Sequence, residues 1–317
     1  MVNIFYLVKN KIKNRISRFV NFEVQKTMEY MLPQLIQFQN SAKEERQSFY
    51  IHTNDPFGNA SLYSQLKERL SAIDVPVEEV EIDIQEFEHW LISFPEINIH
   101  YRNMGDVHIE KCLEHYLAYR FLNINKDDLY IDIAASGSPW TDVLNNRGIK
   151  SFKLDLSYPA GIHGNSIGAD AGNTKLPDGF ATVLSAQCAY ECFMGDADIR
   201  FVKEASRIIK GEGRYGIVPL YLETEYTVST SPYCNQQDVI IESEAKRVWR
   251  DDEYNDPFSR YYSPEIFKSR IYSAIPDNMD GKVLYFKNLP NVMKHFEGQR
   301  IYCFFMFYCE KRSKPSK

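Results

Sequence analysis

The segment from residue 129 to residue 185 constrains the fold of this chain more than any other part. It contains short apolar runs at 129–134, 151–156 and 181–185, which turns of small or polar residues separate. Short apolar runs bounded by turn residues are typical of strands that a parallel sheet buries on both faces. The segment therefore predicts an α/β fold in which these runs form strands of one sheet.

Acidic residues accompany these runs. Asp132 lies in the first run, Asp155 in the second, and Asp170 ends a third segment before the last run. Ligands of an open parallel sheet bind beyond the carboxyl ends of its strands, near the point where the strand order reverses. A carboxylate there can accept hydrogen bonds from two ribose hydroxyls, and the small-residue turn at 135–139 lets a bulky cofactor approach the backbone closely. The pattern therefore predicts a site for a nucleotide-like cofactor.

The order of these pieces resembles that of class I S-adenosylmethionine-dependent methyltransferases. That family has an acid in its first strand before a glycine-rich loop, an acid that ends its second strand, and a further acid before a Leu-Pro-x-x-x-Phe-Asp-x-Val segment. The residues that match here are Asp132, Asp155, Asp170, Leu176, Pro177, Phe180 and Val183. The resemblance covers about residues 106–310. In its details the sequence is similar to members of the family that are encoded beside surface-polysaccharide enzymes.

The resemblance implies a doubly wound, Rossmann-like methyltransferase sheet that is mostly parallel and has an antiparallel last strand. The last two strands, predicted at 282–286 and 301–309, are expected to pair with each other. Helices are predicted at 61–73, 106–122 and 141–147. The predicted regions are a helical N-terminal extension at 1–47, a mixed accessory or cap region at 48–105, and the methyltransferase-like domain at 106–317 with an insertion at 223–262.

The resemblance also implies S-adenosylmethionine as the cofactor and S-adenosylhomocysteine as the product. Asp155 is expected to bind the ribose, and Asp132 to organise the loop and the amino-acid end of the cofactor. Asp170 and Ala171 would lie beside the adenine, although an aspartate that only stabilises a turn is the competing interpretation of Asp170. The residues implied to bind the cofactor are Asp132, Ala134, Ser136, Gly137, Ser138, Asp155, Asp170, Ala171 and Gln187.

The sequence departs from the family pattern in its loop. The three loop glycines of the family fall on Ala134, Ser136 and Ser138, and only Gly137 lies inside the loop. Ala181 also stands where the family has the aspartate of its Phe-Asp pair. These departures leave two alternatives open. One is a non-catalytic member that serves as a binding or assembly module, and the other is an enzyme that uses the pocket for a different nucleotide-like ligand.

The connection between the second and third strands is the other departure. Asp170 follows Asp155 by fifteen positions, which leaves no room for the usual helix, and a loop at 158–165 takes its place. We expect this loop to line the ligand cleft. His163 in the loop is a candidate general base, because a neutral imidazole can take a proton from an acceptor hydroxyl. The competing interpretation is an ordinary surface histidine.

Glu191 is the second candidate for a catalytic residue. It follows the fourth strand, where members of the family place residues that face the sulfonium and the acceptor. Glu191 could equally cap the next helix or form an ion pair with it. No spacing of His, Asp and Glu resembles a metal site, so no metal is predicted. With these residues, the chain is expected to O-methylate a glycan or a small molecule.

Residues 2–32 are predicted to form a helix with one apolar face. The apolar residues at helical spacing are Ile4, Val8, Ile12, Ile16, Phe19 and Val20, and the basic residues between them are Lys9, Lys11, Lys13, Arg15 and Arg18. One interpretation is a basic amphipathic helix, over residues 2–20, that lies on an anionic membrane. The other is a helix that pairs with a second copy of the chain or docks on its own domain. Packing helices are far commoner, so we favour a homo-oligomer or docking.

Composition excludes some classes of function. The net charge of −6 argues against a surface whose main task is to bind nucleic acid. The six cysteines form no Cys-x-x-Cys pair, which indicates reduced, mostly buried thiols in a cytoplasmic protein. No apolar stretch is long enough to span a bilayer, so the expected location is cytoplasmic, with any membrane contact peripheral and at the inner face.

Overall fold

The computed structural model describes most of the chain. The described residues are 24–26, 31–33, 60–230, 239–249 and 258–313. Residues 24–26 and 31–33 are helical. The rest of the helix predicted at 2–32 lies outside the described residues, as does most of the N-terminal extension predicted at 1–47, so these predictions stay predictions.

Within the described residues, eight strands form one central sheet. In sheet order they are β1 (Val77–Val80), β10 (Met279–Phe286), β11 (Phe305–Lys311), β6 (Ile209–Val218), β5 (Ala181–Gln187), β2 (Leu129–Ile133), β3 (Lys150–His163) and β4 (Ser166–Gly168). Neighbouring strands run parallel except at β11, which is antiparallel to both of its neighbours. This arrangement confirms the predicted Rossmann-like methyltransferase sheet, including its antiparallel last strand.

The segment β4-β3-β2-β5-β6 of this sheet has the doubly wound strand order. The chain adds β3 and β4 on one side of β2 and then returns to add β5 and β6 on the other side. The order therefore reverses between β2 and β5, which pair from Tyr130 with Val183 to Ile133 with Ala186. The carboxyl ends of these two strands are the switch point, where such a sheet binds its ligand.

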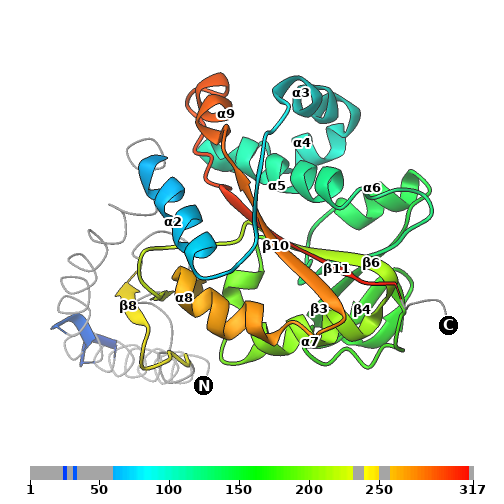
Figure 1. Ribbon diagram of the computed structural model, residues 1–317. Coiled ribbons are helices and arrows are strands. Elements are labelled where there is room, and N and C mark those ends of the chain that lie inside the picture. Colours follow the sequence, from blue (N-terminus) through cyan, green and yellow to red (C-terminus); the bar gives the residue numbers. More distant parts are fainter. Residues whose placement is uncertain (1–23, 27–30, 34–59, 231–238, 250–257, 314–317) are drawn as a thin grey trace, which may run out of the picture.

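Helices cover both faces of the sheet. The α-helices are α2 (Ala60–Ala72), α3 (Ile84–Ser93), α4 (Pro95–Tyr101), α5 (His108–Phe121), α6 (Trp140–Asn146), α7 (Ala197–Ile208), α8 (Pro264–Ile266) and α9 (Leu289–His295). Figure 1 shows α3 to α6 on one side of the sheet and α7 and α8 on the other. The helices predicted at 61–73, 106–122 and 141–147 are α2, α5 and α6, with ends within two residues of the prediction. Shorter helical turns are η1 (Gly105–Val107), η2 (Tyr190–Cys192), η4 (Phe267–Ile271) and η5 (Tyr272–Ala274).

Local sequence explains where some helices begin. The Ser263 side chain accepts a hydrogen bond from the Ile266 N–H, and Pro264 occupies the first position of α8. Asp83 caps α3 in the same way by accepting from the Glu86 N–H. Because these bonds join residues three apart, they form without help from the rest of the fold.

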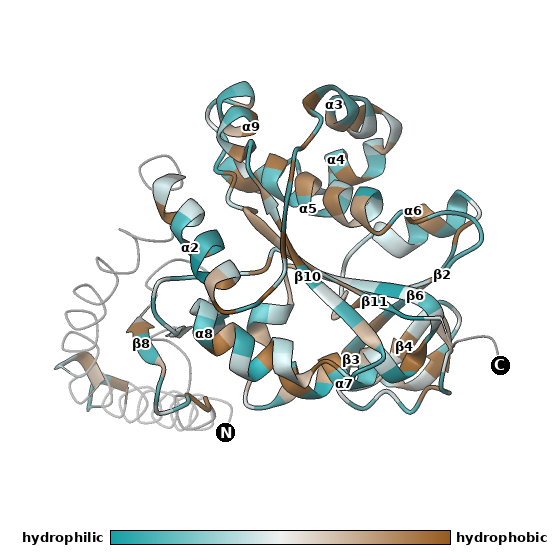
Figure 2. Cartoon of the chain, in the orientation of Figure 1, coloured by the Kyte–Doolittle hydropathy of each residue, from teal (hydrophilic) through white to brown (hydrophobic). Residues whose placement is uncertain are grey.

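The hydrophobic core lies on both faces of the central sheet. Residues 181–186 of β5 are all buried, as expected for a strand that is covered on both faces. Figure 2 shows apolar residues concentrated on the central strands and on the helix faces toward them. α5 differs, because Glu110, Glu114 and His115 are buried on it together with Leu113 and Leu117. Charged groups are rarely buried unless they are paired or have a function.

Residues 60–105 share this sheet and core. β1 pairs with β10 in parallel, from Val77 with Val283 onward. Tyr63 of α2 stacks on Phe304, with ring centroids 3.7 Å apart. The described part of the predicted accessory region is therefore packed against the domain predicted from residue 106.

The loop predicted at 158–165 is instead a β-hairpin. β3 continues to His163 and then turns into β4. β4 pairs with residues 153–155 on one side and with residues 160–163 on the other. Glycine is needed at Gly168, because a Cβ there would lie 1.9 Å from the Pro159 carbonyl oxygen. The prediction was wrong because the two-residue turn Gly164-Asn165 closes a hairpin, and pairing with β4 extends the strand to His163.

The predicted insertion at 223–262 contains strands of a further sheet. Within the described residues these strands are β7 (Thr227–Thr230), β8 (Lys246–Trp249) and β9 (Ser259–Tyr261), in the order β8-β7-β9. β9 contacts η2, the short helical turn that follows β5. This contact places the insertion beside the carboxyl edge of the central sheet.

Candidate functional site

Two residues that directly follow the central strands have left-handed backbone conformations. Ala134, after β2, has a φ of 54°, and Cys188, after β5, has a φ of 48°. A residue other than glycine takes this conformation at a cost of about 1–3 kcal/mol, and such residues cluster at functional sites. The sequence has alanine where the resembled family has its first loop glycine, but the backbone keeps a conformation that glycine adopts freely.

The turn that follows Ala134 is tied to the end of β3 through Asp155. Asp155 Oδ2 accepts a hydrogen bond from the Ser136 N–H at 3.1 Å, and Oδ1 accepts one from the Ser157 N–H at 2.8 Å. The Ser157 hydroxyl also donates to the Ser136 hydroxyl at 3.2 Å. An ionised carboxylate has about four acceptor sites, so Asp155 can still accept from ribose hydroxyls.

Asp132 is buried directly beneath this turn. The Tyr130 hydroxyl donates to Asp132 Oδ1 at 3.3 Å. Burial raises the pKa of Asp132 to about 7, although hydrogen bonds from Tyr130 and Ser138 oppose the shift. A carboxyl group that is half-protonated near neutral pH at a strand end is typical of a functional site.

Gln187 completes a hydrogen-bonded group at the end of β5. Its Nε2 donates to the Tyr130 hydroxyl at 3.0 Å and to the Ser185 hydroxyl at 2.9 Å. Its Oε1 is buried and has no hydrogen-bond partner among the described residues. An unpaired buried acceptor costs about 1–3 kcal/mol, which a donor group on a ligand would recover.

Asp170 follows β4, further along the sheet. Arg200 donates from Nη1 to Asp170 Oδ2 at 2.6 Å, and the Gly172 N–H donates to Oδ1 at 2.8 Å. Ala171, beside it, is buried. Both carboxylate oxygens of Asp170 are thus engaged within the chain, as the turn-stabilising interpretation requires.

His163 does not lie with these residues. It pairs with Ser166 on the outer side of β4, whereas Ser166 pairs on its other side with Lys153, two residues before Asp155. The imidazole is exposed, and its Nε2 lies 3.0 Å from the Ala160 carbonyl oxygen. The hairpin carries His163 back along the edge of the sheet, away from the strand ends. This placement separates His163 from the strand ends, and the expectation that the rest of the segment lines the ligand cleft stays a prediction.

A group of polar side chains that the sequence analysis missed lies where α5 meets the ends of β5 and β6. We call it the α5 polar cluster, and its members are Glu110, Lys111, Glu114, Cys188, Glu191, Tyr221 and Tyr302. At its centre, Lys111 Nζ lies 2.8 Å from Glu114 Oε1 and 2.6 Å from Cys188 Sγ. The left-handed residue that ends β5 therefore touches a buried ion pair on α5.

Further contacts close the cluster. Cys188 Sγ lies 3.6 Å from Glu191 Oε1 and 3.8 Å from the Tyr221 hydroxyl. The Tyr302 N–H donates to Glu110 Oε2 at 3.0 Å. The rings of Tyr221 and Tyr302 stack with centroids 6.1 Å apart. The cluster thus joins α5, the loops after β5 and β6, and the segment before β11.

The carboxyl groups of the cluster are strongly perturbed. Burial, together with nearby Glu114, raises the pKa of Glu110 to about 8, and burial raises the pKa of Glu191 to about 7. Burial also raises the pKa of Glu114, although Lys111 opposes this shift. Glu110 Oε1 and Glu191 Oε2 have no hydrogen-bond partner in the part of the chain that the structure describes. Perturbed acids at a strand end point to a functional site.

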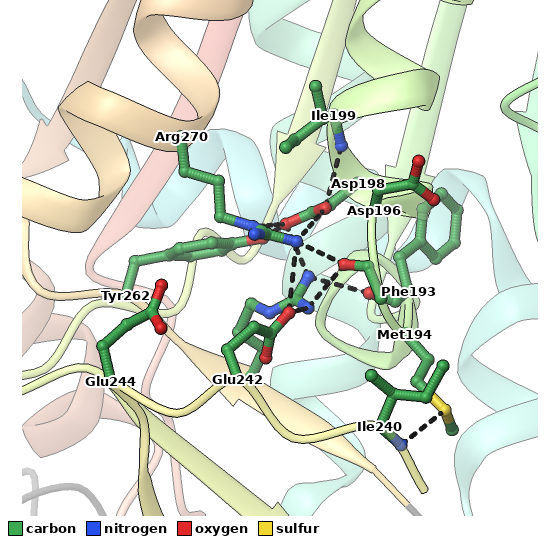
Figure 3. Close-up of polar contacts among 12 residues, drawn as sticks. Phe193, Met194, Asp196, Asp198, Ile199, Ile240, Glu242, Glu244, Tyr262 and Arg270 are labelled. Carbon is green, nitrogen blue, oxygen red and sulfur yellow. Dashed lines mark hydrogen bonds and ion pairs between the residues drawn. The ribbon is translucent and has the colours of Figure 1, made fainter. Parts of the chain in front are cut away.

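A second set of buried charges holds the loop that carries Cys188 and Glu191. We call it the Asp198 network, and its members are Asp198, Glu242, Arg260, Tyr262 and Arg270 (Figure 3). The Arg260 side chain has 0% exposure and donates to the carbonyl oxygens of Phe193 at 2.8 Å and Gly195 at 2.9 Å. A residue of the insertion therefore fixes the end of this loop.

Asp198 is the centre of that network. It accepts from Arg260 at 2.5 Å, from Arg270 Nε at 2.7 Å and from the Tyr262 hydroxyl at 2.7 Å. Glu242, from the insertion, pairs with Arg260 at 2.5 Å. Figure 3 shows Arg270 and Tyr262 pointing toward Asp198, and Glu242 pointing toward Arg270. Two arginines face two carboxylates, so the charges of the network balance.

The sequence carried a signal for the α5 polar cluster. Glu110, Leu113, Glu114 and Leu117 follow the spacing of one helix face, so the two acids share the face that the leucines bury. This spacing could have identified the two acids in the sequence. His115, the next residue, is also buried, and its Nε2 lies 2.9 Å from the Tyr101 hydroxyl.

Comparisons with known proteins give distant matches only. No family model matches the sequence, and a search of curated proteins found no match. Similar solved structures include a 1,6-didemethyltoxoflavin-N1-methyltransferase from Burkholderia thailandensis with bound 1,6-didemethyltoxoflavin and S-adenosylhomocysteine (10% identity, TM-score 0.41, 75% of this chain and 94% of that chain). They also include S-adenosylmethionine-dependent methyltransferases from Mesorhizobium loti (13%, TM-score 0.40, 62% and 98%) and Archaeoglobus fulgidus (13%, TM-score 0.38, 64% and 94%). At these values the fold assignment rests on the strand order and pairing of the sheet itself.

Several other features of the described residues bear on function. None of their helices is long and apolar enough to cross a membrane, and no group of three or more His, Cys, Asp or Glu among them could hold a metal ion. Among the described cysteines, Cys112, Cys188, Cys192, Cys303 and Cys309 form no disulfide bond. A hollow of about 660 Å³, lined by Tyr272, Met279 and Tyr308 among others, lies at the start of β10 and thus at the opposite edge of the sheet from the switch point.

Proposed function

We propose that the protein transfers a methyl group from S-adenosylmethionine to an acceptor. One observation carries this proposal, which is the arrangement at the switch point. The left-handed turn at Ala134, the buried Asp132 and the strand-end Asp155 meet there. Gln187 ends the adjacent strand β5 and contacts Tyr130 of β2, and Glu191 follows β5 in the next turn. A doubly wound sheet binds nucleotide-like ligands at this place.

The residues present suit this cofactor. Asp155 would accept hydrogen bonds from the ribose hydroxyls, and the turn at 136–138 would meet the methionine carboxylate. The unpaired Gln187 Oε1 and the buried Asp132 would accept from the methionine ammonium and balance its charge and that of the sulfonium. When bound, the cofactor supplies an activated methyl group on a positively charged sulfur.

Glu191 is the general base in this proposal. An acceptor hydroxyl must lose its proton as the methyl group arrives. Glu191 Oε2 is buried and has no partner among the described residues, so it is available to a ligand. Burial raises the pKa of Glu191 to about 7, and a base works best when its pKa lies near the working pH. His163, on the outer edge of the sheet, has no part in the proposal.

The setting of the reaction is part of the same proposal. The acceptor is a hydroxyl of a glycan or another small molecule. The resemblance to members encoded beside surface-polysaccharide enzymes supports a role in polysaccharide biosynthesis in the cytoplasm. The segment at 2–20 supports a homo-oligomer, with contact to the inner face of the membrane as the alternative. Light scattering and liposome sedimentation of the full chain separate the two, and a monomer that does not sediment contradicts both.

A non-catalytic binding module is the second candidate function. The observation in its favour is that the chain itself already engages both oxygens of Asp155 and both oxygens of Asp170. In such a module these acids would hold the turns, and Ala171 would be a core residue without contact to adenine.

Calorimetric titration with S-adenosylhomocysteine tests the proposed function. We expect binding, and a higher melting temperature with ligand, because a ligand that binds only the folded state stabilises it. Asp155→Ala should weaken binding by about 1–3 kcal/mol, since it removes a charged hydrogen-bond acceptor. Asp178→Ala is the matched control, because Asp178 is exposed and pairs with Arg207 of α7 at 2.6 Å.

The outcomes separate the candidates. No heat and no thermal shift at high ligand concentration would refute the cofactor assignment. Binding of S-adenosylhomocysteine without methyl transfer from S-adenosylmethionine to any acceptor in a broad panel would favour the non-catalytic module. Equal affinity in the wild type and in Asp155→Ala would remove the role of Asp155 in binding the ribose.

A further inference from the structure

The α5 polar cluster holds more acid than base. It sets the carboxyl groups of Glu110, Glu114 and Glu191 against the ammonium group of Lys111, which pairs with Glu114 at 2.8 Å. Glu110 has 0% and Glu191 8% exposure, and each keeps one buried oxygen without a partner among the described residues. Each unpaired acceptor costs about 1–3 kcal/mol. A ligand that donates hydrogen bonds would recover this cost.

The other members of the cluster are only partly buried. Lys111, Cys188, Tyr221 and Tyr302 all keep part of their surface exposed. The rings of Tyr221 and Tyr302 stack at an interplanar angle of 30° and offer an apolar surface. Sites for small molecules combine aromatic walls with a few placed polar groups, and the cluster has both parts.

The charges of the cluster decide which ligands suit it. A cationic ligand would meet Lys111, whose Nζ lies 2.6 Å from the half-buried Cys188 Sγ. An anionic ligand would meet the carboxyl groups of Glu110 and Glu191. A cation would offset the excess of acid but would be buried beside the ammonium group of Lys111, and burying a charge costs several kcal/mol. The hydroxyls of an uncharged ligand donate to the unpaired carboxyl oxygens without adding charge.

We propose that the α5 polar cluster is the acceptor subsite and that it takes an uncharged polyol with adjacent hydroxyls, such as a sugar ring. One hydroxyl donates to Glu191 Oε2 and its neighbour donates to Glu110 Oε1. The apolar face of the ring packs on Tyr221 and Tyr302. The role of this subsite as an acceptor site rests on the proposed methyl transfer, whereas binding of the polyol can be measured apart from it.

Saturation-transfer NMR on the full chain tests the proposal. The probes are the methyl glycosides of glucose, galactose and mannose, with glucosamine as the cationic counterpart and glucuronate as the anionic one. Each is measured with and without S-adenosylhomocysteine. We expect transfer to at least one uncharged glycoside, with binding at least tenfold tighter than that of either charged sugar. Preference for a charged sugar, or no transfer to any uncharged glycoside, overturns the proposal.

Variants then place the ligand. Glu110→Gln and Glu191→Gln should each weaken binding of the uncharged glycoside about tenfold, because each replaces a carboxyl acceptor by a weaker amide. Glu310→Gln, at the opposite edge of the sheet, is the matched control and should bind like the wild type. Unchanged binding in both cluster variants overturns the subsite.

A parallel titration with S-adenosylhomocysteine separates this proposal from the proposed function. If the glycoside binds in a manner that depends on Glu110 and Glu191 while S-adenosylhomocysteine does not bind, the methyltransferase function falls and the polyol site stands. If S-adenosylhomocysteine binds and no uncharged glycoside does, the subsite falls and the cofactor site stands.

Discussion

Two buried sets of charges flank the loop after β5, and they differ in their numbers of acidic and basic groups. The Asp198 network pairs two carboxylates with two arginines, and Asp198 receives donors on both of its oxygens. The α5 polar cluster sets three carboxyl groups against one ammonium group. Each set has two buried polar atoms without a partner among the described residues, Glu110 Oε1 and Glu191 Oε2 in the cluster and Glu242 Oε2 and Arg260 Nε in the network, so the two sets differ in charge balance. A balanced, hydrogen-bonded network holds structure, whereas an unbalanced one costs stability and persists where a function needs it.

The Asp198 network explains how Glu191 is held in place. Arg260 and Arg270 hold the carbonyl oxygens at the far end of the loop, and the Tyr190 hydroxyl donates to the Asp198 carbonyl oxygen at 3.1 Å. Because these contacts fix the loop, Glu191 remains among the acids of the α5 polar cluster despite the energetic cost of its burial. The Asp198 network therefore holds the loop rigid, and the rigid loop keeps Glu191 in the α5 polar cluster.

The largest expected effect comes from breaking the balanced network. Asp198→Ala leaves Arg260 and Arg270 without their shared acceptor, so we expect a loss of about 3–5 kcal/mol in the free energy of unfolding. Urea denaturation measures this loss. Asp196→Ala is the control, since Asp196 is 71% exposed and pairs with Arg200, and surface pairs contribute about 0–1 kcal/mol. A loss below 1 kcal/mol for Asp198→Ala would show that the network is not an anchor.

In the α5 polar cluster, we expect replacement of an acid to lower activity and not stability. Glu191→Gln removes the proposed base, so we expect turnover to fall by about 10²–10⁴. The free energy of unfolding should stay equal or rise, because a neutral amide is cheaper to bury than an acid without a partner. Activity and denaturation measurements on the same preparation check both halves. A variant that keeps its turnover removes the base, and one that loses several kcal/mol shows that Glu191 is structural.

The pH dependence of stability sharpens the comparison further. Burial raises the folded-state pKa of Glu110 to about 8 and that of Glu191 to about 7, from an ordinary value of 4.5. The folded state then binds more protons than the unfolded state between these values. The contribution to stability is therefore full below about pH 4.5 and is lost as the pH rises through 7 and 8.

We expect the free energy of unfolding to fall across this window, by at most about 1.4 kcal/mol per pH unit for each acid. Denaturation at pH 5, 6, 7 and 8 measures the slope. Glu110→Gln and Glu191→Gln should each make the slope shallower, and Glu310→Gln should leave it unchanged. The same slope in all four proteins would show that these acids do not titrate as described.

The smallest expected effect concerns the strained turn. Ala134→Gly removes the left-handed strain of about 1 kcal/mol, but glycine also gains freedom in the unfolded chain, which offsets roughly half of it. We expect a net gain of a few tenths of a kcal/mol, measured as a small rise in melting temperature. Gly137→Ala, at a φ of 80°, should instead lower the melting temperature. A drop for Ala134→Gly would mean that the alanine methyl group packs favourably and that the turn stores no strain.

Much of the fold was predictable because its signals are local. The apolar run at 181–185 predicted a buried strand, and β5 is buried along those residues. Helical spacing at 61–73, 106–122 and 141–147 predicted helices, and α2, α5 and α6 end within two residues of these ranges. Asp132 and Asp155 were placed at strand ends by the same reasoning. Each of these predictions depends only on residues that are near one another in the sequence.

The α5 polar cluster was missed because it depends on contacts between distant segments. It joins Lys111 to Cys188 and Glu110 to Tyr302, across 77 and 192 positions. No local pattern states which face of a helix another segment will cover, so this cluster appears only in the folded chain. His163 is a different case, because its pairing with Ser166 spans three positions, and the Gly164-Asn165 turn between them is a local hairpin signal that the prediction did not use.

Local hydrogen bonding and apolar spacing act over a few residues. The sequence alone therefore predicted the order of strands and helices, the strand-end acids and the turn after β2. The tertiary structure decided which acids became buried, which pKa values rose and which oxygens lost their partners, because these depend on what packs around each group. Asp132, identified from the sequence, and Glu110, seen only in the fold, are both buried and shifted. The pKa values of both carboxyl groups are raised because segments far apart in the chain bury them.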